Sequence, residues 1–181
     1  MAFADHPEFK PNLTPREILA LGSFGGTYFR PIKSGVTGAS YRKVWKEFPE
    51  EWFVGLDLAR QVESLMYRTE VNAYGVKCGA DLDMWESKGW IVESDPYGWF
   101  QWYCRFYLGR RSSDDSRQIS RGLKCFGPTG RWRIQLCNRI MRAGAAWDDK
   151  SISPVIRQTL QHWGYRLSEE DFKLHEKKNR S

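Results

Sequence analysis

The segment Trp99–Arg111 reads WFQWYCRFYLGRR, and apolar or aromatic side chains occupy nearly every position of it. Wound into a helix, this sequence presents apolar groups on every side, and a helix of that kind is buried. Its polar members Gln101 and Arg105 lie one helical turn apart. We therefore predict a central aromatic helix over residues 99–111, around which the rest of the chain packs.

The sequence on either side predicts further short helices. Thr14 suits the capping position of a helix, Pro15 suits its first residue, and Glu17 completes a capping box. No pair of alternating segments carries a convincing hairpin signal. Apolar periodicity and terminal Gly or Pro residues predict other helices at 40–48, 57–67, 82–88, 113–126, 130–143 and 154–163, and a last one from residue 168.

The predicted fold is mainly α: a single domain of about seven short helices around the central helix, with long Gly/Pro-rich connections. A chain of 181 residues suits one compact domain. We expect an extended arm over residues 1–13 and the helical domain over residues 14–166. Residues 167–181 are expected to form a charged helix that frays into a basic tail.

Two glycine-rich stretches, residues 22–26 and 34–38, precede the second predicted helix. A glycine-rich loop can cradle phosphate, but the spacing here is not GxxxxGK[ST] and no buried strand precedes it. We therefore interpret these glycines as turn residues with positive φ.

The composition is that of a globular protein, with 41% hydrophobic and 28% charged residues. No apolar run approaches the roughly 20 residues of a membrane-spanning helix, and the first residues lack the apolar segment of a secretory signal. The four cysteines form no CxxC pair, and there are three histidines. We expect reduced thiols, no metal, no cofactor, no membrane partner, and a cytoplasmic or nuclear location.

The net charge of +6 is unevenly distributed. Between Trp99 and Arg142 we count ten Lys and Arg against Asp114 and Asp115, so this segment carries +8. A basic segment of that density attracts polyanions. The alternative is a set of solvated helix faces that happen to carry arginine.

The basic segment and the aromatic helix together suggest two groups of candidate binding residues. A buried arginine must pair with a carboxylate or contact a ligand anion, and Trp and Tyr faces stack on planar rings. The predicted ligand-binding residues are Tyr28, Arg30, Gln101, Trp102, Tyr103, Arg105 and Tyr107. Guanidinium groups suit phosphate oxygens, and the predicted phosphate-binding residues are Arg110, Arg111, Arg117, Arg121, Arg131 and Arg133.

Each group has a structural alternative. Arg105 could buttress an aromatic core by pairing with Glu86, Asp95 or Asp115 instead of a ligand. The second group could be a peripheral basic surface. A helix-turn-helix over residues 130–165 is disfavoured, because its connection is about three times the usual length.

Catalytic residues cannot be assigned from the sequence. Cys104 and His162 could form a thiol–imidazole pair, but Cys104 belongs to the apolar helix and is expected to pack there. Asp114 and Asp115 more naturally cap a helix. Whether the protein is an enzyme stays open at this point.

Several strings together resemble a family of hypothetical proteins from fungi, algae, protists and large viruses. The resemblance covers nearly the whole chain, and no activity is attached to that family, so it implies no catalytic residues. It departs at Gly122, where the family pattern carries Trp, which predicts either a cavity at this position or an exposed site. The strings are Thr14-Pro-Arg-Glu-Ile-Leu, Gly25-Gly-Thr-Tyr-Phe-Arg-Pro-Ile, Tyr74-Gly-Val-Lys-Cys-Gly, Trp85-Glu-Ser-Lys-Gly-Trp-Ile, Asp95-Pro-Tyr-Gly followed by the aromatic segment, and Ser153-Pro-Val-Ile-Arg-Gln-Thr-Leu-Gln-His-Trp-Gly-Tyr.

The first functional hypothesis is a nucleic-acid or nucleotide-binding domain that uses arginines for phosphate and aromatic rings for stacking. The alternative is a small-molecule enzyme with an aromatic pocket between the glycine-rich stretch and the central helix. A third is an interaction module with an aromatic surface. The sequence distinguishes neither DNA from RNA nor one oligomeric state from another.

Overall fold

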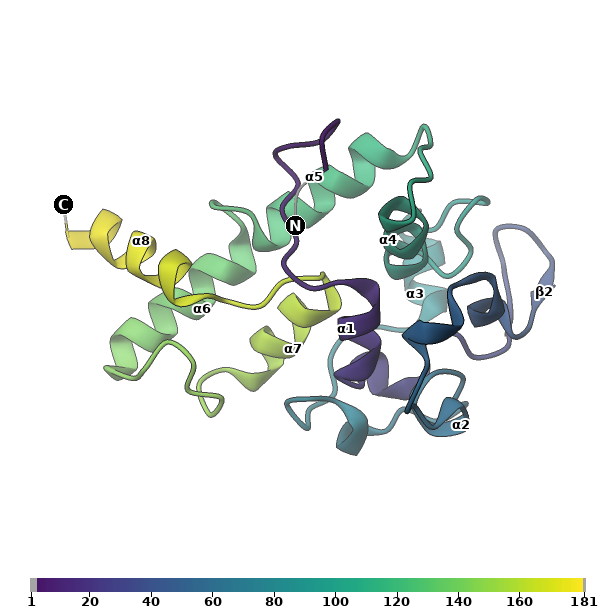
Figure 1. Cartoon of the computed structure of the whole chain (residues 1–181), viewed down its shortest axis with the longest axis horizontal. Coiled ribbons are helices and arrows are strands. Elements are labelled where there is room, and N and C mark those ends of the chain that lie inside the picture. Colours follow the sequence, from purple (N-terminus) through teal and green to yellow (C-terminus); the bar gives the residue numbers. More distant parts are fainter. Residues whose placement is uncertain (1–2, 181) are drawn as a thin grey trace. The chain divides into compact units, whose positions relative to one another are not determined.

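The computed structural model describes residues 3–180, which form eight α-helices, four 3₁₀ helices and one two-stranded sheet (Figure 1). The prediction of a mainly α fold is confirmed. The chain divides into two compact units. Unit 1 contains residues 1–13 and 113–181, and unit 2 contains residues 14–112. The predicted domain boundaries at residues 13 and 166 stay a prediction.

Unit 2 is made of short elements around one longer helix. That helix, α4, spans Trp99–Tyr107. The others are α1 (Pro15–Ala20), η1 (Ser23–Gly26), β1 (Ile32–Lys33), β2 (Ser40–Tyr41), η2 (Val44–Glu47), η3 (Glu50–Trp52), α2 (Leu58–Gln61), η4 (Thr69–Val71) and α3 (Leu82–Ser87).

Helix α4 is the predicted central aromatic helix. Seven of its nine residues are buried, and Trp102, Tyr103 and Phe106 are completely inaccessible. The Trp99 ring stacks on that of Tyr103 at 5.7 Å, and the Trp102 ring stacks on that of Phe106 at 4.8 Å. The helix ends four residues earlier than predicted, because Gly109 takes a left-handed conformation (φ +98°) just after it.

The capping box predicted at Thr14 and Glu17 is confirmed. The Thr14 hydroxyl accepts a hydrogen bond from the Glu17 backbone N–H at 3.1 Å, and the Glu17 carboxylate accepts one from the Thr14 N–H at 2.7 Å. At α3, the Asp81 carboxylate accepts a hydrogen bond from the Met84 N–H at 2.9 Å. These local bonds satisfy donors that a helix start leaves free.

Two predicted helices differ from the sequence pattern: one is replaced by other elements and the other is much shorter. The helix predicted at 40–48 is replaced by strand β2 and the 3₁₀ helix η2, because Ser40 and Tyr41 pair with β1 and Lys43 is left-handed (φ +53°). The sequence carried no convincing hairpin signal here, because each strand has only two residues. The helix predicted at 57–67 keeps one turn, α2, after which the Val62 carbonyl accepts a hydrogen bond from the Phe29 N–H at 2.9 Å.

The first glycine-rich stretch is a structural turn, as interpreted from the sequence. Gly22, Gly25 and Gly26 all have positive φ, and so does the buried Phe24 between them. A Cβ at Gly26 would lie 1.9 Å from the Arg60 carbonyl oxygen, and one at Gly22 would lie 1.6 Å from a backbone oxygen of η4. Gly22 and Gly26 have no side chain because other backbone segments occupy that space.

Gly26→Ala should therefore destabilise the protein far more than Gly38→Ala. Both glycines are left-handed, with φ of +76° and +71°, but a Cβ at Gly38 would meet nothing within 4 Å. We expect a loss of about 1 kcal/mol for Gly38→Ala, from the backbone conformation alone, and at least about twice that for Gly26→Ala, measured by urea unfolding. Equal losses would show that the close approach to Arg60 is not what requires glycine.

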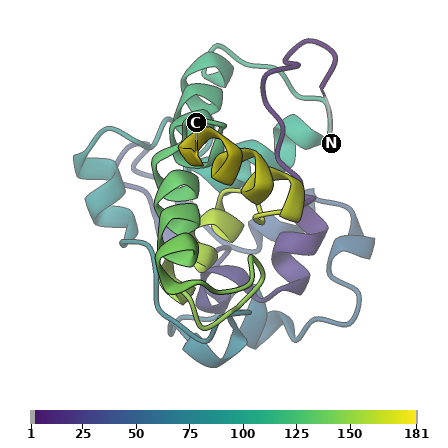
Figure 2. The same ribbon diagram turned by 90° about the vertical axis from the view of Figure 1, so that its left-hand side faces the viewer.

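Unit 1 contains the four remaining helices and the N-terminal arm. Helix α8 packs against α6, as Figure 2 shows from the end of the molecule. Helix α6 also packs against α5 and α7. The helices are α5 (Asp115–Phe126), α6 (Arg131–Ala143), α7 (Pro154–His162) and α8 (Glu169–Arg180).

The arm is fixed to unit 1 by hydrogen bonds and one buried ring. The Asn12 amide donates to the Arg166 carbonyl and accepts from the Arg166 N–H, both at 2.8 Å. Phe9 is completely buried against Phe126, which in turn stacks on Tyr165 at 5.5 Å. Residues 3–13 are therefore part of the folded unit.

Gly122 lies within α5 on its buried side. The alternative that this position is exposed is therefore excluded. An open groove does lie beside Ile119 and Lys124, but Gly122 does not line it. That this glycine replaces a packed Trp stays a prediction.

The buried His162 makes unit 1 sensitive to acid. It is 6% exposed, it shares a hydrogen bond with Gln158 at 3.0 Å, and burial lowers its pKa from 6.5 to about 3. Below about pH 6.5 the unfolded chain takes up a proton here that the folded chain does not bind until about pH 3. The contribution of His162 to stability therefore falls as the pH falls through this interval.

His162→Gln should reduce the loss of stability between pH 7 and pH 5. Glutamine keeps a hydrogen-bonding group but does not titrate, so the variant's thermal midpoint should change less over this interval than that of the original chain. His6→Gln, which removes a less buried histidine, is the control. An unchanged pH dependence in His162→Gln would contradict the assignment.

Candidate functional site

An ion-pair network joins α4 to the segments before and after it. Asp95 has no exposed side-chain surface and accepts hydrogen bonds from Arg105 Nη1 at 3.0 Å and from Arg110 Nη2 at 2.7 Å. Arg105 also pairs with both oxygens of Glu47, through Nε at 2.9 Å and Nη2 at 2.8 Å, and donates to the Ser94 carbonyl. Most of the donors of Arg105 are thus used within the protein.

The polar groups of α4 and the glycine-rich segment are bonded to one another. The Tyr28 hydroxyl donates to the Tyr97 carbonyl at 2.6 Å and accepts from the Gln101 N–H at 2.9 Å. Gln101 Oε1 accepts from the Tyr97 N–H at 3.0 Å, and the Tyr97 hydroxyl donates to the Arg30 carbonyl at 2.7 Å. Burial raises the pKa of Tyr28 and raises that of Tyr97 to about 12, so both remain neutral donors.

The predicted ligand-binding residues therefore come together, but as part of the core. Tyr28, Gln101, Trp102 and Tyr103 are buried, and Arg30, Arg105 and Tyr107 are partly exposed. Of the three carboxylates weighed as partners for Arg105, Asp95 is the one that binds it. Glu86 instead accepts hydrogen bonds from Ser34 and Gly35, and Glu47 is a partner that the sequence did not suggest.

Asp95→Asn should destabilise the protein much more than Glu47→Gln. Removing the charge of Asp95 leaves two arginines without their buried partner, which typically costs about 3–5 kcal/mol. The Glu47 side chain is 34% exposed, and its loss should cost about 1 kcal/mol or less. Urea unfolding measures both, and a smaller effect for Asp95→Asn would contradict the central role of this carboxylate.

Most of the predicted phosphate-binding arginines are engaged inside the protein. Arg117 pairs with Asp114, with Nη2 2.9 Å from Oδ2, and Arg133 pairs with Asp171 at 2.7 Å. Arg121 bonds Gln118 at 3.0 Å and lies over the Trp163 ring. The group is also divided, since Arg110 and Arg111 belong to unit 2 and the other four to unit 1.

Arg110 and Arg111 make contacts next to α4. Arg110 binds Asp95, and the Arg111 guanidinium lies 4.0 Å from the centre of the Phe106 ring while donating to the Phe106 carbonyl. Arg131 differs from the rest of the group: it is exposed, and its guanidinium stacks over its own neighbour Trp132 at 5.0 Å.

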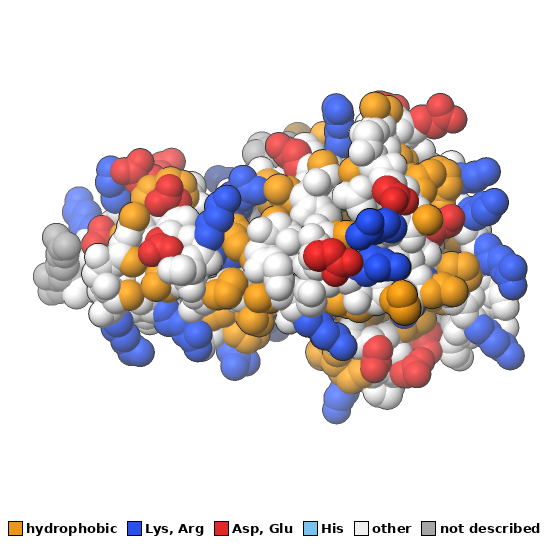
Figure 3. All heavy atoms as spheres, turned by 90° about the horizontal axis from the view of Figure 1, so that it is seen from below, with side chains coloured by type: hydrophobic (Ala, Val, Ile, Leu, Met, Phe, Trp, Pro, Cys, Tyr) orange, Lys and Arg blue, Asp and Glu red, His pale blue; other side chains and the backbone are white. Residues whose placement is uncertain are grey.

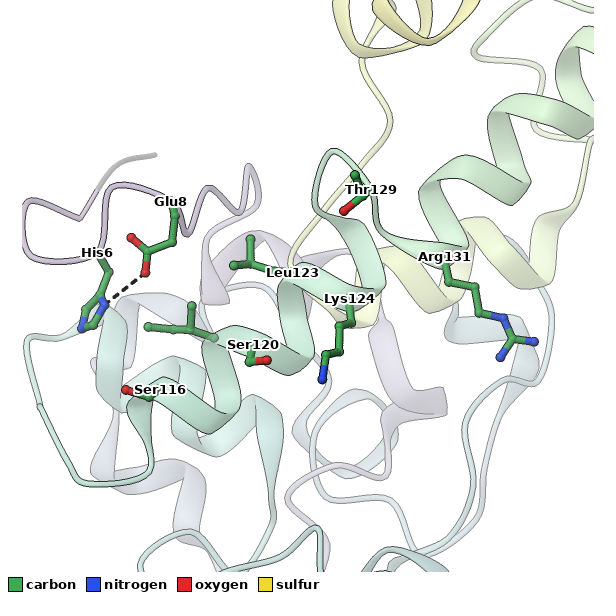
Figure 4. Close-up of a pocket in the computed structure, with 9 residues that line it drawn as sticks. His6, Glu8, Ser116, Ser120, Leu123, Lys124, Thr129 and Arg131 are labelled. Atoms are coloured by element: carbon green, nitrogen blue, oxygen red, sulfur yellow. Dashed lines mark hydrogen bonds and ion pairs between the residues drawn. The ribbon is translucent and has the colours of Figure 1, made fainter. Parts of the chain in front are cut away.

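An open groove in unit 1 contains Arg131 together with residues that the sequence did not single out. Its volume is about 660 Å³. The arm forms one side with His6 and Glu8, α5 forms the floor, and the start of α6 forms the far end (Figure 4). The lining residues are His6, Glu8, Ser116, Ile119, Ser120, Leu123, Lys124, Thr129 and Arg131.

The charged side chains are unevenly distributed along the groove. His6 Nδ1 lies 3.4 Å from Glu8 Oε1, so the carboxylate has a neighbour at the arm side. Lys124 and Arg131, at the other end, are exposed and have no carboxylate partner among the described residues. Three hydroxyl groups line the groove, and Ile119 and Leu123 supply its apolar surface. Such a surface can bind an anion of extended shape.

The residues weighed for catalysis are buried. Cys104 is completely inaccessible in unit 2, and burial raises its pKa well above the usual range of a thiol. His162 is buried in unit 1, as described above. All four cysteines are free and buried, and within residues 3–180 no cluster of three His, Cys, Asp or Glu residues has the arrangement of a metal site. Among the described helices, none is long and apolar enough to span a membrane.

Comparison of the chain with models of protein families, with curated proteins and with solved structures finds no match. The resemblance drawn from the sequence therefore stays a prediction.

Proposed function

We propose that the protein binds nucleic acid through unit 1, with the groove between the arm, α5 and the start of α6 holding phosphate groups. The observation that supports this most directly is the pair of exposed, carboxylate-free cations Lys124 and Arg131 in one groove with three hydroxyl groups. Cationic and hydroxyl side chains are the groups that most often bind nucleic-acid phosphates.

The charge of unit 1 supports the same ligand class. This unit has fifteen Lys and Arg against ten Asp and Glu, so it carries +5 of the total +6. From Ser116 to Trp147 the sequence contains no acidic residue. An excess of this kind attracts a polyanion over a distance of about 8–10 Å at ordinary salt.

The exposed side of α6 extends the basic surface away from the groove. Arg142 lies eleven residues after Arg131, which is three helical turns, so the two residues share a face of the helix. Arg139 lies beside this face and donates to the Ser153 hydroxyl at 3.1 Å. All three arginines are exposed. The spacing suits a ligand with repeated negative charges better than a single mononucleotide.

A double variant, Lys124→Gln/Arg131→Gln, should weaken oligonucleotide binding and reduce its dependence on salt. Each lost phosphate contact reduces the slope of log K against log salt concentration by about 0.7 to 0.9, so we expect a decrease of about 1.4 to 1.8. Fluorescence anisotropy with labelled single-stranded and double-stranded oligonucleotides, over a range of NaCl concentrations, measures this slope.

The matched control is Lys150→Gln/Arg166→Gln, which removes one exposed lysine and one exposed arginine from the same unit but outside the groove. It should retain most of the affinity and the salt slope. If the original chain binds no oligonucleotide at low salt, or if both double variants lower the slope equally, the groove is not a phosphate-binding site.

A further inference from the structure

The β1–β2 hairpin of unit 2 carries a second group of cations that the basic segment at 99–142 does not include. Between Glu17 and Glu47 the sequence has no acidic residue. Lys33, Arg42, Lys43 and Lys46 lie in or directly after the hairpin, and all four are exposed. Within residues 3–180, none of the four has a carboxylate partner. This contrasts with Arg105, Arg110, Arg117 and Arg133, which are all neutralised internally.

The strand register places Lys33 on the exposed face of the hairpin. Ile32 pairs with Tyr41, and Lys33 pairs with Ser40. Side chains alternate along a strand, so Lys33 and Ser40 share the face opposite to Ile32 and Tyr41, and Arg42, which directly follows β2, is exposed as well. Ile32 is buried, so the face that carries the cations is turned to solvent.

The remaining two cations follow the hairpin without a break. Lys43 is the N-cap residue directly before η2, and Lys46 lies within η2, with its ammonium 5.7 Å from the centre of the Trp45 ring. The Trp45 indole N–H donates to Glu63 at 2.9 Å, which fixes the ring. Figure 3 shows Lys and Arg side chains along the right-hand edge, the end of unit 2 at which β2 lies.

The hairpin is held in one conformation, although its strands are only two residues long. The Ser34 hydroxyl accepts hydrogen bonds from the Val36 and Thr37 N–H groups at 3.2 Å, and the Ser34 backbone closes the turn with Ala39 and Gly38 at 2.9 Å. Glu86 of α3 accepts from Ser34 and Gly35. A fixed turn loses little conformational freedom when it binds, which favours affinity.

We infer that this basic hairpin, defined as Lys33, Arg42, Lys43 and Lys46, is a second phosphate-binding surface for nucleic acid. Unpaired cations on a rigid turn fit the repeated charge of a nucleic-acid backbone, and the ring of Trp45 lies beside them. The inference takes its ligand class from the proposed function but uses residues of the other unit. Phosphate binding by the groove and phosphate binding by the basic hairpin can therefore be tested independently.

The test compares two triple variants with the same change in charge and the same residue types. Lys33→Gln/Arg42→Gln/Lys46→Gln removes three cations of the basic hairpin and leaves the left-handed Lys43 in place. Arg16→Gln/Lys77→Gln/Lys88→Gln removes three exposed cations of unit 2 outside it. The control also removes a lysine that lies over an aromatic ring, as Lys46 does: the Lys77 ammonium lies 5.7 Å from the centre of the Tyr67 ring.

The hairpin variant should lower the salt slope of oligonucleotide binding by about two to three and weaken binding at 0.1 M NaCl by about tenfold or more. The control variant should change neither strongly. Circular dichroism and thermal unfolding establish that each variant is folded. A loss confined to the hairpin variant supports the inference even if the groove variant binds normally, and in that case only the proposed groove is wrong.

Three results would overturn the inference. The first is equal weakening by both triple variants, which would indicate an effect of net charge. The second is an unchanged slope in the hairpin variant while the groove variant loses affinity. The third is binding of the original chain to phosphatidylserine vesicles, but not to oligonucleotides, that the hairpin variant abolishes, which would assign the hairpin to an anionic membrane surface.

Discussion

The structure of unit 2 depends on keeping one carboxylate charged where no water reaches it. Asp95 is inaccessible and precedes the buried helix α4 by a single turn. An isolated carboxylate in that position would be strongly unfavourable, and the two guanidinium groups of Arg105 and Arg110 offset this cost. Arg105 extends from α4 to Glu47 and Asp95, and Arg110 lies just beyond the end of the helix. The pairing thus fixes both ends of the helix relative to the turn that precedes it.

This pairing also decides which cations remain for a ligand. An arginine that holds a buried carboxylate cannot at the same time bind phosphate without exposing that carboxylate unpaired. The densest basic segment of the sequence therefore overstates the charge that an approaching ligand meets. Within that segment, Lys124 and Arg131 in the groove have no carboxylate partner among the described residues, and the cations of the basic hairpin lie outside the segment. Carboxylates near these two surfaces are bound to other groups: Glu8 lies 3.4 Å from His6, and Glu63 accepts a hydrogen bond from Trp45.

Much of the fold could be predicted because the relevant signals are local. The capping box at Thr14 and Glu17 and the aromatic segment of α4 act within a few residues, and both are found where expected. The hairpin could not be predicted from alternation, because its strands have two residues each and its turn depends on the Ser34 hydroxyl. The sequence placed Asp95, ten residues from Arg105, among the candidate partners of that arginine, but it named no partner for Arg117 and did not suggest Glu47. Arg117 and Asp114 are three residues apart, whereas Arg105 and Glu47 are 58 residues apart, and no spacing rule connects them.

The kinds of side chain in the two proposed surfaces limit what they can recognise. Reading a base edge takes bidentate contacts in a fixed geometry, such as those of Arg with guanine or of Asn and Gln with adenine. The buried Gln101, Gln118 and Gln158 have this chemistry but bond other protein groups. The lysines, arginines and hydroxyls of the groove and the basic hairpin are proposed to contact phosphates, and a phosphate contact carries no sequence information of its own. Binding through these surfaces should therefore depend strongly on salt and weakly on base sequence, and any preference would have to come from the shape or flexibility of the nucleic acid.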